Sequence, residues 1–142
     1  MGSLDDRCVN LVKRYSETME EIGHGRHRKT FDIGMGRVIK VPSWSDGIQA
    51  NIHEAEWDLC SHNSVPELRI PLAKCFLVAS FDKEIPLLVM QKVDRIYDLS
   101  LGWLHPMSHR DLPDWVKYID SNQVGLDEDH NIVVYDGGDC PC

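Results

Sequence analysis

The sequence predicts an α+β fold in which an antiparallel sheet, built from hairpins, packs with two amphipathic helices. Two segments carry apolar residues at three- and four-residue spacing, which is the period of a helix. Other segments are short apolar runs that flank turn residues, which is the pattern of β-hairpins. At 142 residues, we expect one domain over residues 1–142.

Composition limits the classes of function. The chain is 42% hydrophobic and 27% charged, and it contains neither a long apolar run nor an apolar leader near its first residue. A net charge of -8 makes nucleic acid a poor partner. Five cysteines, an odd number, favour free thiols in a reducing compartment. We therefore expect a cytoplasmic protein with no membrane and no nucleic-acid partner.

The first predicted helix spans residues 4–22. Ser3 and Asp6 resemble a capping box, and Gly23 is a natural stop. The apolar stripe of this helix consists of Leu4, Cys8, Leu11, Val12, Tyr15, Met19 and Ile22.

A hairpin and a second helix follow. Phe31 and Ile33 precede the turn at 34–36, and a second strand follows that turn, which predicts a hairpin within an antiparallel region over residues 29–93. The second helix is predicted over residues 48–62. Its apolar stripe consists of Ile48, Ile52, Ala55 and Leu59.

The rest of the chain predicts two further hairpins. Apolar runs at 72–80 and 85–93 surround a polar turn, and strands at 123–126 and 132–135 surround an acidic one. Between these hairpins, residues 94–112 read as irregular and 113–119 as a short helix. The short helix and the last hairpin together span 113–138.

Four motifs carry a resemblance: "GHGRHRKTFDIGMGRVIK", "VIKVP", "LLVMQKV" and "VGLDEDHNIVVYDGG". Over residues 23–138, with gaps, they resemble the protein-kinase-like fold, and most closely the small kinase-like (pseudokinase) proteins encoded by bacteriophages. The resemblance implies a truncated kinase-like fold: the second helix corresponds to the kinase helix C, and the helical lobe is largely missing.

The resemblance also implies a nucleotide site. Lys40 would pair the nucleotide phosphates and a helix glutamate, and Gly23 and Gly25 would lie in the phosphate-covering hairpin, where Arg28 replaces a third glycine. Met90 would lie near the gatekeeper position. Asp136, followed by two glycines, would be the metal-binding aspartate.

Two candidates for the helix glutamate stay open. Glu54 fits the way related phage sequences read, whereas a rotation of about 100° per residue places Glu56 beside the apolar stripe and favours it. Both could also be solvated charges on the helix.

The spacing of the candidate residues does not fit a kinase catalytic loop. His109-Arg110-Asp111-Leu112 matches a kinase motif, but the fifth residue after Asp111 is Val116, which cannot bind magnesium. Counting back from Asp136 places Gln123 or Asn122 at the metal position and no carboxylate at the base position. Asp111 is better explained as a helix cap, so we expect no catalytic residue and no metal ligand.

We therefore expect a non-catalytic kinase-like binding module, a viral intracellular effector that acts by protein–protein interaction, with a host factor as the candidate target. Lys40, Glu54 or Glu56, Asp136, Gly23 and Gly25 would form a vestigial or weak nucleotide site, and no cofactor is expected. Two alternatives remain: a small phosphotransferase with an atypical loop that uses ATP and magnesium, and an unrelated α+β interaction domain.

The partner surface is predicted in the segment before the short helix. Tyr97, Trp103 and Trp115 lie in or beside it, and aromatic residues are enriched at binding hot spots. The alternative is that the tryptophans cover the core.

Overall fold

A computed structural model describes residues 3–56, 71–81, 83–95, 97–98, 103–104 and 124–135. The fold is mixed α+β, with antiparallel sheets and two helices in the described residues. The chain divides into two compact units, Met1–Glu56 with Lys74–Gln91 and Trp57–Ala73 with Lys92–Cys142. The single domain over residues 1–142 stays a prediction.

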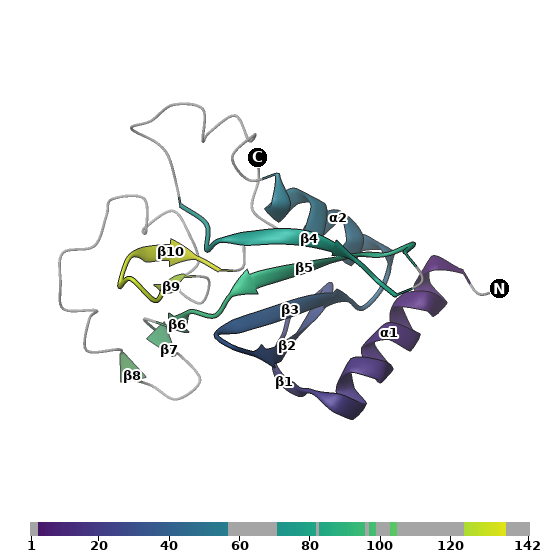
Figure 1. The fold of residues 1–142 in the computed structure, drawn as a ribbon, viewed down its shortest axis with the longest axis horizontal. Helices are drawn as coiled ribbons and strands as arrows, with labels where there is room; N and C mark the ends of the chain where they lie inside the picture. The colour runs from purple at the N-terminus through teal and green to yellow at the C-terminus, as the bar shows by residue number, and fades with distance from the viewer. Residues whose placement is uncertain are drawn as a thin grey trace. The chain divides into compact units, whose positions relative to one another are not determined.

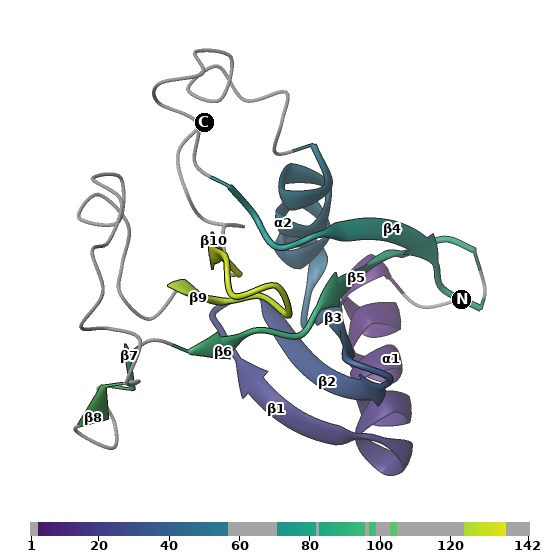
Figure 2. The same ribbon diagram turned by 60° about the vertical axis from the view of Figure 1, so that its left-hand side comes forward.

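The first unit is a five-stranded antiparallel sheet with a helix on either side (Figures 1 and 2). Its strand order is β1-β2-β3-β5-β4. The strands are β1 (Glu20–His24), β2 (Arg28–Gly34), β3 (Arg37–Pro42), β4 (Cys75–Ala79) and β5 (Pro86–Gln91), and the helices are α1 (Leu4–Thr18) and α2 (Ser45–Ala55).

Helix α1 begins as predicted and ends early. Ser3 and Asp6 form the reciprocal capping box, but the helix ends at Thr18 and not at residue 22. Residues beyond Met19 instead pair with β2, where the sheet satisfies their backbone groups. Gly23 is therefore not a helix stop. It lies in β1 at a bulge, where the register shifts between Glu21 and Gly23.

Both hairpins predicted in this part of the sequence are confirmed. β2 pairs with β3 around a turn in which Gly34, Met35 and Gly36 all have positive φ, which two glycines make inexpensive. β4 pairs with β5 in a regular register from Cys75 opposite Met90 to Ala79 opposite Pro86.

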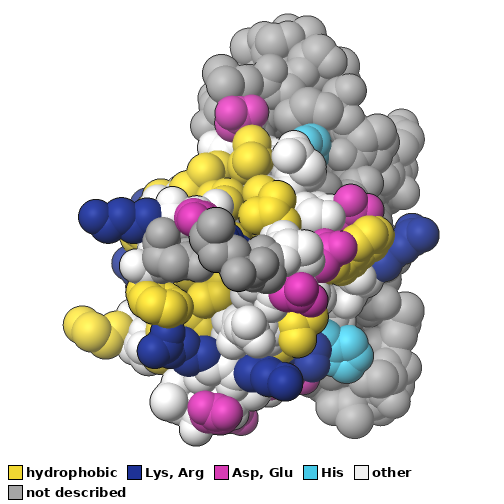
Figure 3. Space-filling view, turned by 90° about the vertical axis from the view of Figure 1, so that its right-hand side faces the viewer, with side chains coloured by type: hydrophobic (Ala, Val, Ile, Leu, Met, Phe, Trp, Pro, Cys, Tyr) yellow, Lys and Arg dark blue, Asp and Glu magenta, His cyan; other side chains and the backbone are white. Residues whose placement is uncertain are grey.

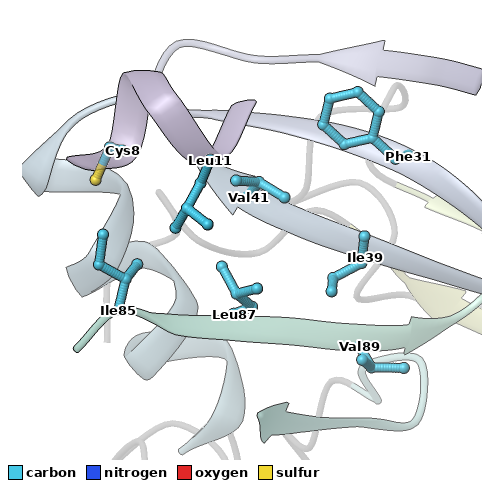
Figure 4. Packing of buried hydrophobic residues seen from close by; sticks show 8 residues of the cluster. All are labelled: Cys8, Leu11, Phe31, Ile39, Val41, Ile85, Leu87 and Val89. Atoms are coloured by element: carbon cyan, nitrogen blue, oxygen red, sulfur yellow. The ribbon is translucent and has the colours of Figure 1, made fainter. Parts of the chain in front are cut away.

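The two faces of this sheet are packed differently. The face toward α1 is apolar, because alternate residues of β2, β3 and β5 meet the stripe of α1 (Figure 4). This cluster consists of Cys8, Leu11, Phe31, Ile39, Val41, Ile85, Leu87 and Val89.

The face toward α2 is closed by small and polar residues. Helix α2 begins at Ser45, ends at Ala55, and buries Gly47, Ala50, Asn51 and Glu54. The predicted stripe was wrong at Ala55, which is exposed, while Ile52 is half-buried and Ile48 packs against the core. Leu59 and the predicted part of the helix over 57–62 lie outside the described residues. A hydrophobic period cannot identify a buried face that is made of glycine, alanine and hydrogen-bonded polar side chains.

The second unit contains two small sheets. β6 (Asp94–Arg95), β9 (Val124–Leu126) and β10 (Ile132–Val134) form a sheet in the order β10-β9-β6, which confirms the predicted last hairpin. β7 (Tyr97–Asp98) pairs with β8 (Trp103–Leu104). The prediction of an irregular segment over 94–112 was therefore wrong at β6, β7 and β8. These strands have two residues each, which is too short for a pattern of alternating apolar and polar residues.

The acidic turn of the last hairpin is closed by its own first residue. Asp127 Oδ1 accepts hydrogen bonds from the backbone N–H groups of Asp129 and Asn131, at 2.9 and 2.8 Å. The predicted short helix at 113–119 lies outside the described residues. None of the described helices has the length and apolar character needed to cross a membrane.

Replacement of Gly47 by alanine should destabilise the protein by about 1–3 kcal/mol, although alanine is normally the better helix residue. The new Cβ would lie 2.3 Å from the His27 carbonyl oxygen and 2.8 Å from Pro42 Cα, both backbone atoms. Gly25→Ala is the matched control, since nothing lies within 4 Å of its added Cβ. Equal urea midpoints for the two variants would contradict the close approach of α2.

Stability should fall at alkaline pH through Cys8. Burial, and then the Asp5 carboxylate, raise the pKa of this thiol above its ordinary value of 9.0. The folded protein therefore keeps a proton that the unfolded chain releases, so this contribution is complete below about pH 9 and is lost as the pH rises.

Urea unfolding of wild type and Cys8→Ala at about pH 7 and about pH 10 measures the effect. The wild type should lose more stability than Cys8→Ala over this range. Parallel losses would show that the thiol does not contribute.

Candidate functional site

A buried ion pair joins β3 to α2. Lys40 Nζ lies 3.1 and 3.0 Å from the two carboxylate oxygens of Glu54. The exposed fraction of the side chain is 5% for Lys40 and 0% for Glu54. The pair is thus almost fully removed from water. In such a buried site charge-assisted hydrogen bonds are strong, and the loss of one partner is costly because it leaves the other charge unpaired.

Arg28, at the start of β2, binds the same carboxylate. Its guanidinium makes an ion pair with Glu54 and donates a hydrogen bond of 3.1 Å to Asn51 Oδ1. The Arg28 side chain is 7% exposed. One carboxylate therefore serves two buried cations, which come from neighbouring strands of the sheet.

Asn51 connects this cluster to the next strand. Its Nδ2 donates to the carbonyl oxygens of Lys40, at 3.2 Å, and of Pro86, at 2.9 Å. Its Oδ1 accepts the hydrogen bond from Arg28, so the side-chain amide of Asn51 both donates and accepts. Asn51 lies one turn before Glu54 on α2. We call Arg28, Lys40, Asn51 and Glu54 the Glu54 cluster.

The structure decides between the two glutamates. Glu54 faces Lys40, whereas Glu56 is exposed and occupies the C-cap of α2. The helical-geometry argument for Glu56 was wrong because it took the apolar stripe as the buried face. The buried face contains Gly47 and Ala50, and Glu54 continues it by one turn.

The hairpin that carries the predicted glycines is held against the first turn of α2. Gly25 lies at its tip, and its N–H donates to the Arg28 carbonyl at 2.9 Å. Ser43 N–H donates to the His27 carbonyl at 2.8 Å, and the rings of His27 and Trp44 lie 5.4 Å apart. These contacts to the start of α2 are made by His27, whereas Gly23 pairs with Thr30 of β2.

Some of the other residues discussed in the sequence analysis lie outside the described residues, namely Asp136, Trp115 and the segment at 109–112. Tyr97 and Trp103 lie on the paired strands β7 and β8, opposite Leu104 and Asp98 respectively. Their role as partner anchors stays a prediction.

Met90 is buried on β5, opposite Val38 of β3. Within the described part of the chain, no group of three or more histidine, cysteine or acidic side chains could hold a metal ion.

The sequence analysis selected Lys40 as a candidate and noted that Arg28 replaces a glycine of the motif. It did not select Asn51. An asparagine in the middle of a helix is unfavourable unless its side chain has a partner, and this was the available signal.

Comparisons with known proteins place no family on this chain. No protein-family model and no curated protein matches the sequence. A solved structure, a point mutant of aminoglycoside 2'-phosphotransferase-IIIa in complex with GDP, is similar at 13% identity with a TM-score of 0.41. The match covers 65% of this chain and 31% of that protein, so this chain spans about a third of its length. A likeness this weak carries no conclusion about ligand or activity.

Glu54→Gln should destabilise the protein by about 3–5 kcal/mol, because it removes the charge that two buried cations share while keeping the side-chain size. Glu56→Gln, two residues away and exposed, should change the free energy of unfolding by less than about 0.5 kcal/mol. Urea unfolding at neutral pH compares the two variants. If Glu56→Gln were the more damaging change, the assignment of the ion pair would be wrong.

Proposed function

We propose that this chain is a kinase-like module that acts by binding a protein partner and not by transferring phosphate. The observation that carries this proposal is Arg28. Its buried guanidinium binds the carboxylate of Glu54, which the resemblance implies as the partner of Lys40.

The kinase-like part of the proposal is supported by the order of elements in the first unit. A hairpin carries Lys40, a helix carries Glu54, and an apolar hairpin follows. The Lys40–Glu54 contact is the one that the resemblance implied. It joins the sheet to α2 beside the contacts that Arg28 and Asn51 make.

The non-catalytic part is supported by Arg28. A phosphate-covering hairpin must let its backbone approach the ligand, which is why glycines suit it. Here the third glycine position holds an arginine whose guanidinium points inward to Glu54 and Asn51. The sequence also lacks a base and a metal asparagine at kinase spacing.

The proposed partner is a protein. The resemblance to bacteriophage-encoded proteins suggests a host protein inside the cell, and Tyr97, Trp103 and Trp115 are the proposed anchors. Capture from a host lysate by wild type, compared with Trp103→Ala, tests this part. Retention of the same protein by both forms would remove Trp103 from the interface.

A small phosphotransferase is the second candidate. It is favoured by one observation: the Lys40–Glu54 pair is formed, as an active nucleotide site requires. Nucleotide binding distinguishes the two candidates.

Thermal unfolding with millimolar Mg-ATP and Mg-GTP should show no stabilisation. A nucleotide present at about a hundred times its dissociation constant would stabilise the protein by about 2.7 kcal/mol, which is easily detected. The proposal fails if a stabilisation appears together with phosphate transfer, and if both disappear in Lys40→Met and persist in Lys29→Met. Lys29 is a suitable control because it lies on β2, pairs with Glu21 and is 39% exposed.

A further inference from the structure

Helix α2 begins without a side-chain cap of its own. Its N-cap residue is Trp44, and the side chain of this residue makes no capping hydrogen bond. The cap comes instead from the other helix, because Asp5 Oδ1 in the first turn of α1 accepts a hydrogen bond of 2.8 Å from the Ser45 backbone N–H. A carboxylate at this place satisfies a free N–H group and complements the positive end of the α2 dipole.

This contact joins two helices that pack on different faces of the sheet. Helix α1 covers the apolar face, whereas α2 covers the polar one (Figures 1 and 2). Further along α1, Arg7 makes an ion pair with Glu84 in the turn between β4 and β5. The Arg14 guanidinium lies 4.1 Å from the ring centre of Phe81, in the same turn. Helix α1 is thus fixed both to the start of α2 and to the β4–β5 turn.

Few side chains of α1 are fully buried. Of its 15 residues, Cys8 and Leu11 are buried, whereas Leu4 and Val9 are 49% and 46% exposed. Figure 3 shows the side of the molecule on which α1 lies, where hydrophobic side chains share the surface with charged side chains of both signs. An element with so little buried apolar surface opens at a lower free energy than the central strands of the sheet.

The start of α2 is also in close contact with the β1–β2 hairpin. The Ser43 N–H donates to the His27 carbonyl oxygen at 2.8 Å. A Cβ added at Gly47 would lie 2.3 Å from that same oxygen. Since the two segments are packed this closely, a displacement of the first turn of α2 must also change its contact with the hairpin.

We propose that α1 controls the first turn of α2. Undocking of α1 from the sheet withdraws Asp5 from Ser45, and the first turn of α2 then opens together with its contact to the β1–β2 hairpin. The Glu54 cluster stays closed in this event, because Asn51 and Glu54 lie on the later part of α2 and bind the sheet directly. The inference does not rest on the proposed function, since it involves neither a nucleotide nor a protein partner.

Hydrogen exchange of the Ser45 amide, followed by NMR, tests the contact. Asp5→Ala should raise its exchange rate about fivefold, which is the effect of losing one helix cap. Asp5→Asn should leave the rate within about twofold of the wild type, because asparagine is an equally good cap. Asp6→Ala is the matched control. It removes a carboxylate from the same turn of α1, but that carboxylate accepts from Ser3 and not from α2, so Ser45 should exchange as in the wild type.

Undocking is tested by Leu11→Ala, on the buried side of α1. Exchange at Ser45 should rise about tenfold or more beyond exchange at Ile39, whose amide in the central strand β3 reports unfolding of the whole unit. Leu11→Ala should add nothing when combined with Asp5→Ala, since the cap is then already absent. Glu84→Gln removes the charged partner of Arg7, and it is a milder second change with the same expected direction.

Three results would overturn the proposal. The first is unchanged exchange at Ser45 in Asp5→Ala. The second is exchange at Ser45 that rises only as much as at Ile39 in both Leu11→Ala and Glu84→Gln, which would show that α1 does not open separately. The third is an equal effect of Leu11→Ala in the wild type and in Asp5→Ala, which would show that the two helices are coupled by another route.

Discussion

The first unit depends on the carboxylate of Glu54, which is buried between the sheet and α2. Arg28 from β2 and Lys40 from β3 both bind it, and Asn51 extends the contacts to the backbone of β3 and β5. Burying a carboxylate is costly unless cations and hydrogen bonds surround it, so these residues must be assembled together or not at all. This requirement fixes where α2 lies along the sheet more narrowly than apolar packing could.

The two faces of the sheet are therefore held to their helices by different interactions. The α1 face is an apolar core that contains a buried thiol, and it contributes stability through removal of apolar surface from water. The α2 face is closed by Gly47 and Ala50, which let the helix approach, and by polar groups that accept only one arrangement. Buried ion clusters add little net stability and can add specificity of arrangement. We attribute the placement of α2 to this second effect.

The sequence predicted those parts of the fold whose signal is local. Turn glycines located the hairpin at β2–β3, apolar runs around polar turns located those at β4–β5 and β9–β10, and the capping box located the start of α1. The end of α1 was missed because Ile22 suits a helical stripe and a strand equally well. The buried face of α2 was missed because its signal is non-local: Glu54 is buried only since Arg28 and Lys40 come to it from the sheet. For the same reason Asn51 could not be assigned a role from sequence.

The central claim joins an observation, that Glu54 holds both Lys40 and Arg28 in a buried cluster, to the proposal that this cluster takes no nucleotide. The most direct test is observation of the Lys40 side-chain ammonium by ¹⁵N NMR, with and without millimolar Mg-ATP. The account predicts an ammonium signal that exchanges slowly with water, that is lost in Glu54→Gln and that does not move when nucleotide is added. An ammonium that exchanges as fast as that of exposed Lys83, or that shifts on addition of Mg-ATP, would contradict it.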